Sequence, residues 1–307
     1  MKPFFKVVLT TLSILIIGVF TIEYLYKDYK TTIDKKFDAY NKQRSSQVIL
    51  IGNSHVGCLN EPEFNGKTSF NFSIGGQDIF HFYTILKTVL EQENNIELVI
   101  IGVDYDLFGY DYKIANTMWL DRTYYKKTKS LYDSSYSNKI MATSAFFRSN
   151  RDFSYLFRSK ENIADSQNIK EENKMFTPII GSAKDRAIEH SVHKFDVNLV
   201  NSNVSYLEKI IFLTLSKGVN IVLINLPKQN NYYNNYNKEV IEIGEKEFEL
   251  IRNKYQVPVF DFWESPVFND TDFVDGDHLS EIGAKKVLSI IEDSIINTQT
   301  HNNVYTK

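Results

Sequence analysis

Short apolar runs recur along the chain at intervals typical of the strands of a parallel sheet. Five such runs are Gln47–Gly52, Ser69–Ile74, Glu97–Val103, Val219–Leu226 and Val257–Phe260. Several of them are almost continuously apolar, as strands covered by helices on both faces must be. The pattern therefore predicts five buried strands.

Between these runs, apolar residues recur three and four positions apart, which is the period of a helix that buries one face. The pattern predicts helices over Ile79–Leu90 and Val204–Leu215, and a last helix over Ser280–Ile296 with Ser280 as its N-cap. Because strands and helices alternate, we predict a doubly wound, three-layer α/β domain over residues 47–297. We expect residues 298–307 to form a polar tail.

The interval between the third and fourth strands is too long for a simple crossover. Residues 111–203 are rich in Tyr, Asn, Ser and Lys and exceed the length of a bare loop. We expect a helical insertion or cap that lies over one end of the sheet. The run Gln229–Asn237 (QNNYYNNYN) has two interpretations, a polar surface loop or a rim that contacts sugar, and we prefer the surface loop.

An apolar segment precedes the α/β domain. Val7–Ile22 carries no charge, and with its apolar flanks it reaches about 20 residues, enough to cross a bilayer. A buried N-terminal helix is the alternative, but the segment lacks a polar face. No small-x-small cleavage site follows it, so we expect an uncleaved signal anchor at residues 1–26. We expect the polar, lysine-rich residues 27–46 to form a stalk.

Composition and charge narrow the possible functions. The 307 residues are 43% hydrophobic and 24% charged, which is typical of a globular protein and excludes wholesale disorder. The formal charge of −3 gives no electrostatic reason to expect nucleic acid as a partner. Cys58 is the one cysteine, so no intrachain disulfide can form. We expect neither a cofactor nor a metal ion.

Two motifs place a possible serine nucleophile and its base on one edge of the predicted sheet. The first strand leads directly into Asn53 and Ser54, at the rim where α/β sheets bind ligands. A serine before a helix is by itself more often an N-cap. Near the C-terminus, Asp275 precedes His278 by three residues, so its carboxylate can bind one imidazole nitrogen while the other accepts the serine proton.

These motifs resemble those of the SGNH (GDSL-type) hydrolases, over residues 47–110 and 219–296. Gly52-Asn53-Ser54 resembles the first block of that family, Gly76 the glycine of the second, and Asp275-x-x-His278 the last and most specific block. The resemblance implies a flavodoxin-like SGNH fold in which Ser54 attacks an ester, His278 removes its proton and Asp275 orients His278. It also implies that backbone N–H groups of Ser54 and Gly76 donate to the oxyanion.

The third block departs from the family pattern. In Gly102-Val103-Asp104-Tyr105, Asp104 stands where the family has an asparagine that donates to the oxyanion. An ionised carboxylate has no proton to donate and repels an oxyanion. Asp104 is therefore turned away from the site, protonated, or part of a different task. We treat Asn53 and Asp104 as pocket candidates, and the departure weakens the expectation of a fast general esterase.

A membrane-anchored chain with these motifs resembles proteins that O-acylate cell-envelope glycans, such as the alginate acetylation proteins and the D-alanyl lipoteichoic-acid protein. The resemblance implies a serine acylesterase or O-acyltransferase that acts on a cell-envelope or exported polysaccharide. The implied partners are an acylated polysaccharide or acyl donor, the membrane, and a multi-spanning membrane O-acyltransferase. We expect the catalytic domain outside the cytoplasm, although the lysines that flank the span do not themselves fix this orientation.

Two other functions fit parts of the sequence. A non-catalytic accessory protein that binds glycan through a degenerate site is favoured by Asp104, whereas the intact Ser54, Asp275 and His278 favour an enzyme. A hydrolase of lipids or small esters is disfavoured by the polar, tyrosine-rich insertion.

The remaining histidines have structural interpretations. His190 and His193 have the spacing of helical metal ligands, but no cysteine or paired acid completes a site. We therefore expect both on a solvated helix face. We expect His55, next to Ser54, to serve local packing or hydrogen bonding.

Several acids and both tryptophans are also open to two interpretations. Asp106 and Asp111 are pocket acids or turn residues, and the sequence does not separate the two. We expect Asp277 to be a solvated turn residue. We expect Trp119 and Trp263 in aromatic core packing rather than against a sugar.

Overall fold

The computed structural model describes residues 2–43, 45–61, 63–157 and 182–304. The chain divides into two compact units. The N-terminal unit comprises Met1–Asp38 and Met118–Ile169, and the sheet unit comprises Ala39–Thr117 and Lys170–Lys307.

The sheet unit is built on a six-stranded sheet with the strand order β2-β3-β1-β4-β5-β6. The strands are β1 (Val48–Ile51), β2 (Glu63–Phe64), β3 (Lys67–Asn71), β4 (Leu98–Gly102), β5 (Asn220–Asn225) and β6 (Val259–Asp261). Every neighbouring pair is parallel except β2 with β3. The five predicted runs correspond to β1, β3, β4, β5 and β6, and the predicted α/β fold class is confirmed.

The sixth strand, β2, forms a tight hairpin with β3 that the sequence analysis did not predict. Asn65 and Gly66 join the two strands, and both have positive φ angles, +51° and +67°. An Asn-Gly pair is the preferred sequence for this kind of two-residue hairpin turn. The Asn-Gly pair is visible in the sequence, but β2 has only two residues and no apolar run of its own, so no strand was predicted there.

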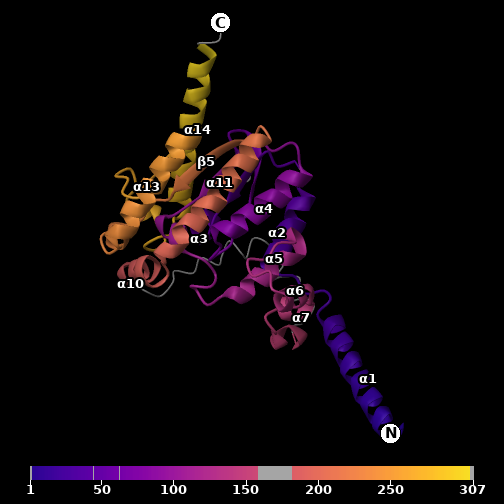
Figure 1. The fold of residues 1–307 in the computed structure, drawn as a ribbon. Coiled ribbons are helices and arrows are strands. Elements are labelled where there is room, and N and C mark those ends of the chain that lie inside the picture. Colours follow the sequence, from indigo (N-terminus) through magenta and orange to yellow (C-terminus); the bar gives the residue numbers. More distant parts are fainter. Residues whose placement is uncertain (1, 44, 62, 158–181, 305–307) are drawn as a thin grey trace. The chain divides into compact units, whose positions relative to one another are not determined.

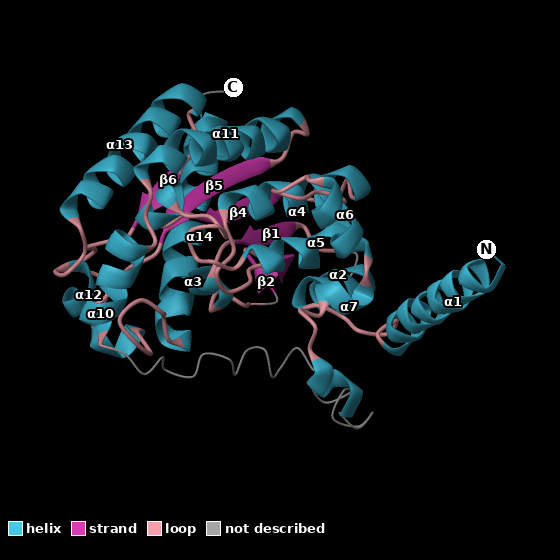
Figure 2. Cartoon of the chain, turned by 60° about the horizontal axis from the view of Figure 1, so that its bottom comes forward, coloured by secondary structure: helices cyan, strands magenta, loops and turns pink. Residues whose placement is uncertain are grey.

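Helices cover both faces of the sheet. Those of the sheet unit are α3 (Ser54–Gly57), α4 (Ile79–Gln92), α10 (Ala183–Ile188), α11 (Val200–Ser216), α12 (Asn230–Tyr233), α13 (Lys238–Tyr255) and α14 (Glu281–Val304). Figure 1 shows α4, α11 and α13 side by side over one face. The strands form the middle layer in Figure 2. The predicted helices lie within α4, α11 and α14.

Burial on both faces explains why β1 reads as a continuous apolar run. Successive side chains of a strand point to opposite faces, and all four residues of β1 are buried. Val48 and Leu50 pack in one core cluster with Val287 and Ile291 of α14. Each fully buried aliphatic side chain contributes about 1.5–3 kcal/mol to folding, so this layer fixes the strand that leads to Ser54.

The last helix begins as predicted but ends later. The Ser280 hydroxyl accepts a hydrogen bond from the Gly283 backbone N–H at 3.3 Å, as expected of an N-cap. The helix continues to Val304, beyond the predicted end at Ile296. Most of the segment 298–307, expected as a polar tail, is therefore helical.

The N-terminal unit contains one helix, α1 (Lys2–Leu25), that is long and apolar enough to cross a membrane. Its other helical segments include α2 (Thr32–Lys42), which runs into the sheet unit, and α5 (Asp121–Thr128), α6 (Tyr136–Thr143) and α7 (Ala145–Arg148). The expectation of a bare stalk over residues 27–46 is corrected here. Ile33 and Phe37, one helical turn apart in α2, are buried, and the surrounding lysines hid this apolar face.

The predicted insertion, residues 111–203, is divided between the two units. Residues 118–157 belong to the N-terminal unit, whereas residues 182–203 belong to the sheet unit. Residues 158–181 lie outside the described residues. The insertion is therefore not one continuous cap.

The C-terminal end of α1 is packed into the N-terminal unit. Tyr26 is fully buried, and its ring lies 5.2 Å from Phe146 and 5.4 Å from Tyr155. Its hydroxyl donates to the Asp152 carbonyl at 2.8 Å, and the Glu23 carboxylate accepts the Ala145 backbone N–H at 2.8 Å. Glu23 and Tyr26 therefore belong to the folded unit, and the predicted anchor boundary at residue 26 is too late.

This packing predicts different outcomes for two truncations. A chain that lacks residues 1–21 keeps Glu23 and Tyr26 and should unfold cooperatively without detergent. A chain that lacks residues 1–26 should lose stability on the order of 3–5 kcal/mol, the usual cost of removing a buried aromatic side chain. Thermal unfolding followed by circular dichroism measures the difference. In the chain that lacks only residues 1–21, Tyr26→Ala should reproduce the loss of stability, whereas Tyr24→Ala, at an exposed position, should not. Equal melting temperatures of the two truncated chains would contradict this account.

Candidate active site

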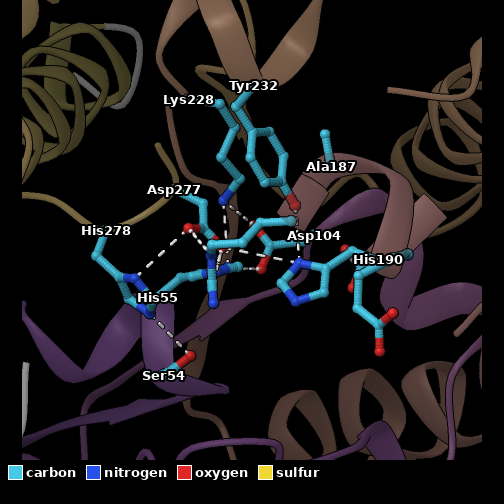
Figure 3. A network of polar contacts seen from close by, with 12 residues as sticks. Ser54, His55, Asp104, Ala187, His190, Lys228, Tyr232, Asp277 and His278 are labelled. Carbon is cyan, nitrogen blue, oxygen red and sulfur yellow. Dashed lines mark hydrogen bonds and ion pairs between the residues drawn. The ribbon is translucent and has the colours of Figure 1, made fainter. Parts of the chain in front are cut away.

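The candidate site lies at the carboxyl ends of the central strands. β1 is flanked by β3 on one side and β4 on the other, so the order in which the chain adds strands to the sheet reverses at β1. Ligands of open α/β sheets bind at such switch points. Ser54 follows β1, and Asp104 follows β4. Figure 3 shows both residues with His278, which comes from the loop before α14.

Two glycines allow the turn that carries Ser54 to lie against the sheet. A Cβ atom at Gly52 or Gly102 would collide with the side chain of Val56 in α3. Without those Cβ atoms, α3 packs closely over the ends of β1 and β4. The Asn53 side chain then caps α3, because its Oδ1 accepts the backbone N–H of His55 at 2.9 Å.

Ser54, His278 and Asp275 form a continuous hydrogen-bonded series. The Ser54 Oγ lies 3.1 Å from the His278 Nε2, and the His278 Nδ1 lies 3.0 Å from each Asp275 oxygen. Asp275 has no proton to donate, so Nδ1–H donates to it and Nε2 accepts from the serine hydroxyl. Asp275 is itself held by the His278 backbone N–H at 2.8 Å. The structure thus brings Ser54 and Asp275 each within hydrogen-bond reach of His278.

His278 is neutral in this setting. Burial lowers the pKa of His278 below its usual value, and the nearby charge of His55 lowers it further, against the opposing effect of the Asp275 carboxylate. Burial acts to raise the pKa of Asp275, but hydrogen bonding to His278 outweighs it and lowers that pKa. The pair is therefore a neutral imidazole beside an ionised carboxylate.

Asp104 is part of a buried ion pair rather than of the cavity wall. Its carboxylate accepts hydrogen bonds from the Lys228 Nζ at 2.9 Å, the His55 Nδ1 at 2.5 Å and the Asn53 Nδ2 at 2.9 Å. Burial acts to raise the pKa of Asp104, but Lys228 and His55 together hold it well below its usual range. Of the three alternatives for Asp104, the structure favours an ionised residue with a different task, which is to hold the Asn53–Ser54 turn.

His55 continues this ion pair to a second carboxylate. Its Nε2 lies 2.8 Å from the Asp277 Oδ2, and its pKa is raised to about 9 because the two carboxylates outweigh both burial and the charge of Lys228. Arg186 of α10 donates to both Asp277 oxygens, at 2.7 and 2.6 Å. The expectation that Asp277 is a solvated turn residue is wrong, because this carboxylate is fully buried between His55 and Arg186.

Two groups of the described residues have the composition of a metal site, His55 with His190 and Asp277, and Asp275 with Asp277 and His278. In the second group, the His278 Nδ1 is already bound to Asp275. Single ligand atoms of His55, His190 and Asp277 lie within 4.8 Å of one another. However, His55 is held between two carboxylates, and the Arg186 guanidinium already supplies the cation that faces Asp277. These donors therefore do not fit a metal ion unless Arg186 moves away.

The triad opens into a cavity of about 310 Å³ whose walls combine polar and apolar surface. It is lined by Asn53, Ser54, His55, Gly75, Gly76, Gln77, Asp106, Leu107, Tyr110, Arg186, His190, Lys194 and His278. Leu107 and Tyr110 are among its apolar lining residues. Of the two pocket candidates, Asn53 lines it and Asp104 does not, and Gly76, expected in the oxyanion hole, lines it as well.

The structure also separates the other sequence candidates. Asp106 lines the cavity, whereas Asp111 accepts the Ile114 backbone N–H in a turn at 2.8 Å. His190 lines the cavity, so the expectation of a solvated position is wrong for it, whereas His193 is exposed. Trp263 is buried in the aromatic core as expected.

Two residues of the site were missed in the sequence. Lys228 follows the carboxyl end of β5, and its position after a strand was a usable signal. Arg186 lies in the insertion, far from any recognised motif, and carried no such signal.

The ion pair predicts a large effect of one substitution on stability. Asp104→Asn leaves the Lys228 ammonium buried without its carboxylate, which should cost about 3–5 kcal/mol in the free energy of unfolding. Denaturant unfolding measures this cost, with Asp270→Asn at an exposed position as the control. The double variant Asp104→Asn, Lys228→Met should lose less than the sum of the single losses. An Asp104→Asn chain as stable as wild type would refute the role assigned to Asp104.

Comparisons with known proteins find similar solved structures but no related sequence. No model of a known protein family matches the chain, and no curated protein matches it. Among solved structures, the chain is similar to a GDSL-like lipase from Bacteroides thetaiotaomicron, with 9% identity, a TM-score of 0.42, and coverage of 86% of this chain and 98% of that one. It is also similar to a protein provisionally described as a platelet activating factor from Streptococcus pneumonia, with 13% identity, a TM-score of 0.40, and coverage of 94% and 98%. The six-stranded, mostly parallel sheet with Ser54, His278 and Asp275 at its carboxyl edge has the layout of an SGNH-like fold.

Proposed function

We propose that this chain is a serine esterase of the SGNH type that moves a short acyl group from an alcohol oxygen to water or to a second hydroxyl. The observation that carries the proposal is the hydrogen-bonded series Ser54–His278–Asp275, which opens into the cavity. A nucleophile, a neutral base and an orienting carboxylate in this order are the parts that acyl transfer needs.

The reaction proceeds in two steps. The Ser54 Oγ attacks the ester carbonyl while the His278 Nε2 takes the hydroxyl proton, and His278 then returns that proton to the departing alcohol oxygen. The C–O bond to the alcohol breaks, and an acyl-serine remains. A water molecule, or a hydroxyl of a second molecule, next gives its proton to His278 and attacks the acyl group. Ser54 regains its proton, and the product is the free acid or a new ester.

The oxyanion is held by backbone groups. Gly75 and Gly76 run beside the nucleophile, since an ideal Cβ at Gly75 lies 3.8 Å from the Ser54 Cβ. Gly76 has φ +69°, a conformation that favours glycine. We assign the N–H groups of Ser54 and Gly76 as donors. Asp104 takes no part, because it is held by Lys228 outside the cavity.

The cavity walls favour a short acyl group on a polar alcohol. Gln77, Asp106, Arg186 and Lys194 contribute charged or amide groups, which suit hydroxyl-rich ligands and disfavour a long acyl chain. With α1 as a single-pass membrane anchor, we propose an acylated envelope or exported polysaccharide as substrate and an extracytoplasmic site. A multi-spanning membrane O-acyltransferase is a fitting partner for the transfer reaction.

The alternative of a non-catalytic accessory protein loses its main argument. That alternative depended on Asp104 as a degenerate catalytic residue. Asp104 instead forms a buried ion pair with Lys228, and the serine, histidine and aspartate remain in contact with one another.

The esterase proposal predicts how two substitutions act on hydrolysis of 4-nitrophenyl acetate by the full chain in detergent. Ser54→Ala should lower kcat by about a thousandfold or more, and Asp275→Asn by roughly a hundredfold to ten-thousandfold. Ser216→Ala, at an exposed position on α11, is the control and should match wild type. Full activity in the Ser54→Ala chain would overturn the proposal.

The pH dependence of the same reaction tests the state of His278. The base acts in its neutral form, and the pKa of His278 is lowered, so activity should persist as the pH falls below 6.5 and vanish only at lower pH. Asp275 raises this pKa, so the residual activity of Asp275→Asn should decline at a still lower pH. The midpoint of the acid limb of kcat/KM gives the answer, and a wild-type midpoint above pH 6.5 would contradict the assignment.

A further inference from the structure

Two buried tyrosines behind the cavity each bind one residue of its wall. The Tyr232 hydroxyl lies 2.8 Å from the His190 Nδ1, and the Tyr236 hydroxyl donates to the Asp106 Oδ1 at 3.1 Å. The two rings lie side by side, with centroids 5.6 Å apart. Burial raises the pKa of both tyrosines well above the usual value, so both hydroxyls keep their protons and act as donors.

These bonds fix which atoms of His190 and Asp106 remain for a ligand. Burial lowers the pKa of His190 to about 3, so its ring is neutral. Its Nδ1 accepts from Tyr232, and therefore the ring proton is on Nε2. Among the described residues, neither the His190 Nε2 nor the Asp106 Oδ2 has a hydrogen-bond partner, and neither is among the fully buried unpaired atoms. Both atoms are thus accessible on residues that line the cavity.

The two open atoms have complementary roles. The Asp106 carboxylate accepts a hydrogen bond, and the pKa of Asp106, raised to about 6 by burial and by Asp104, leaves it ionised at neutral pH. The His190 Nε2–H donates one. A hydroxyl both donates and accepts, so adjacent hydroxyls of a polyol match this pair, whereas a hydrocarbon chain does not.

The tyrosines come from the run Gln229–Asn237, which the sequence analysis interpreted as a polar surface loop. Tyr232 and Tyr236 are buried, so that expectation is wrong for these two residues. Asn237 also donates its backbone N–H to the Ser191 Oγ at 3.0 Å. Ser191 lies in the same π-helical turn, Glu189–His193, as His190. The run is therefore joined by three hydrogen bonds to Asp106 and to the turn that carries His190.

We propose that Asp106 and His190, held in place by Tyr236 and Tyr232, bind free hydroxyl groups of the alcohol part of the substrate and make the site selective for partly acylated sugars. This inference rests on the proposed esterase function, and it assigns the specificity of that site to residues outside the Ser54–His278–Asp275 triad. Asp106 and His190 contact the substrate, whereas Tyr232 and Tyr236 are positioning residues.

Three acetyl esters separate this role from a merely structural one. A mono-O-acetylated methyl glucoside has free hydroxyls, its fully acetylated form has none, and 4-nitrophenyl acetate has no sugar. For the full chain in detergent, Asp106→Asn should lower kcat/KM for the mono-acetylated glucoside by about tenfold or more, mainly through KM. Tyr236→Phe and Tyr232→Phe should lower it by about three- to tenfold. The two tyrosine variants should stay within about twofold of wild type on the other two esters, and the loss caused by Asp106→Asn should be several-fold smaller on those esters than on the mono-acetylated glucoside.

Tyr233→Phe, in the same run but with no hydrogen bond from its hydroxyl among the described residues, is the matched control and should leave all three rates unchanged. A parallel loss on all three esters, or no loss on the mono-acetylated glucoside, would overturn the inference.

A binding measurement keeps this test separate from the esterase proposal. NMR titration of the full-length Ser54→Ala chain with the mono-acetylated glucoside should show saturable binding. Adding Asp106→Asn should weaken it about tenfold or more. If wild type cleaved none of the esters while this binding depended on Asp106, the esterase proposal would fail and the hydroxyl-binding pair would stand. If Asp106→Asn left the affinity for the mono-acetylated glucoside unchanged, the hydroxyl-binding role of Asp106 and His190 would be overturned, whatever the hydrolysis rates.

Discussion

The buried ion pair between Asp104 and Lys228 is the interaction on which the rest of the site depends. It joins the carboxyl ends of β4 and β5, and through Asn53 and His55 it holds the turn that presents Ser54. Removing one charge from such a pair leaves the other charge buried and uncompensated, which is strongly destabilising. The charged His55 also binds Asp277, so the ion pair is extended to a second carboxylate. Asn53 and His55, on either side of the nucleophile, are therefore held by polar contacts rather than by apolar packing.

This arrangement explains how the chain departs from the SGNH pattern without losing the geometry of the triad. An aspartate replaces the asparagine that the family uses as an oxyanion donor, and the aspartate is withdrawn from the cavity by Lys228. In the proposed mechanism, the backbone N–H groups of Ser54 and Gly76 serve the oxyanion instead. The insertion contributes Arg186 and His190 to the cavity, so the segment with the least family resemblance contributes to the wall where selectivity would arise.

The sequence predicted what depends on local pattern and failed where long-range contacts decide. Continuous apolar runs such as Glu97–Val103 identified the parallel strands, because burial on both faces leaves that signature. The spacing of Asp275 and His278 predicted their contact, because three residues in one turn suffice to make it. Asp277 was misjudged because its partners, His55 and Arg186, lie 222 and 91 residues away in the chain. No local pattern reports such a pairing.

The central claim is that Ser54 becomes covalently acylated by a base that Asp275 orients. Intact-protein and peptide mass spectrometry of the full chain, quenched in acid shortly after mixing with 4-nitrophenyl acetate, tests this most directly. The account predicts one acetyl group per chain on the peptide that contains Ser54, and none on that peptide in the Ser54→Ala or His278→Ala chains. Acetylation confined to lysines, or a modified Ser54 peptide that forms equally fast without His278, would contradict it.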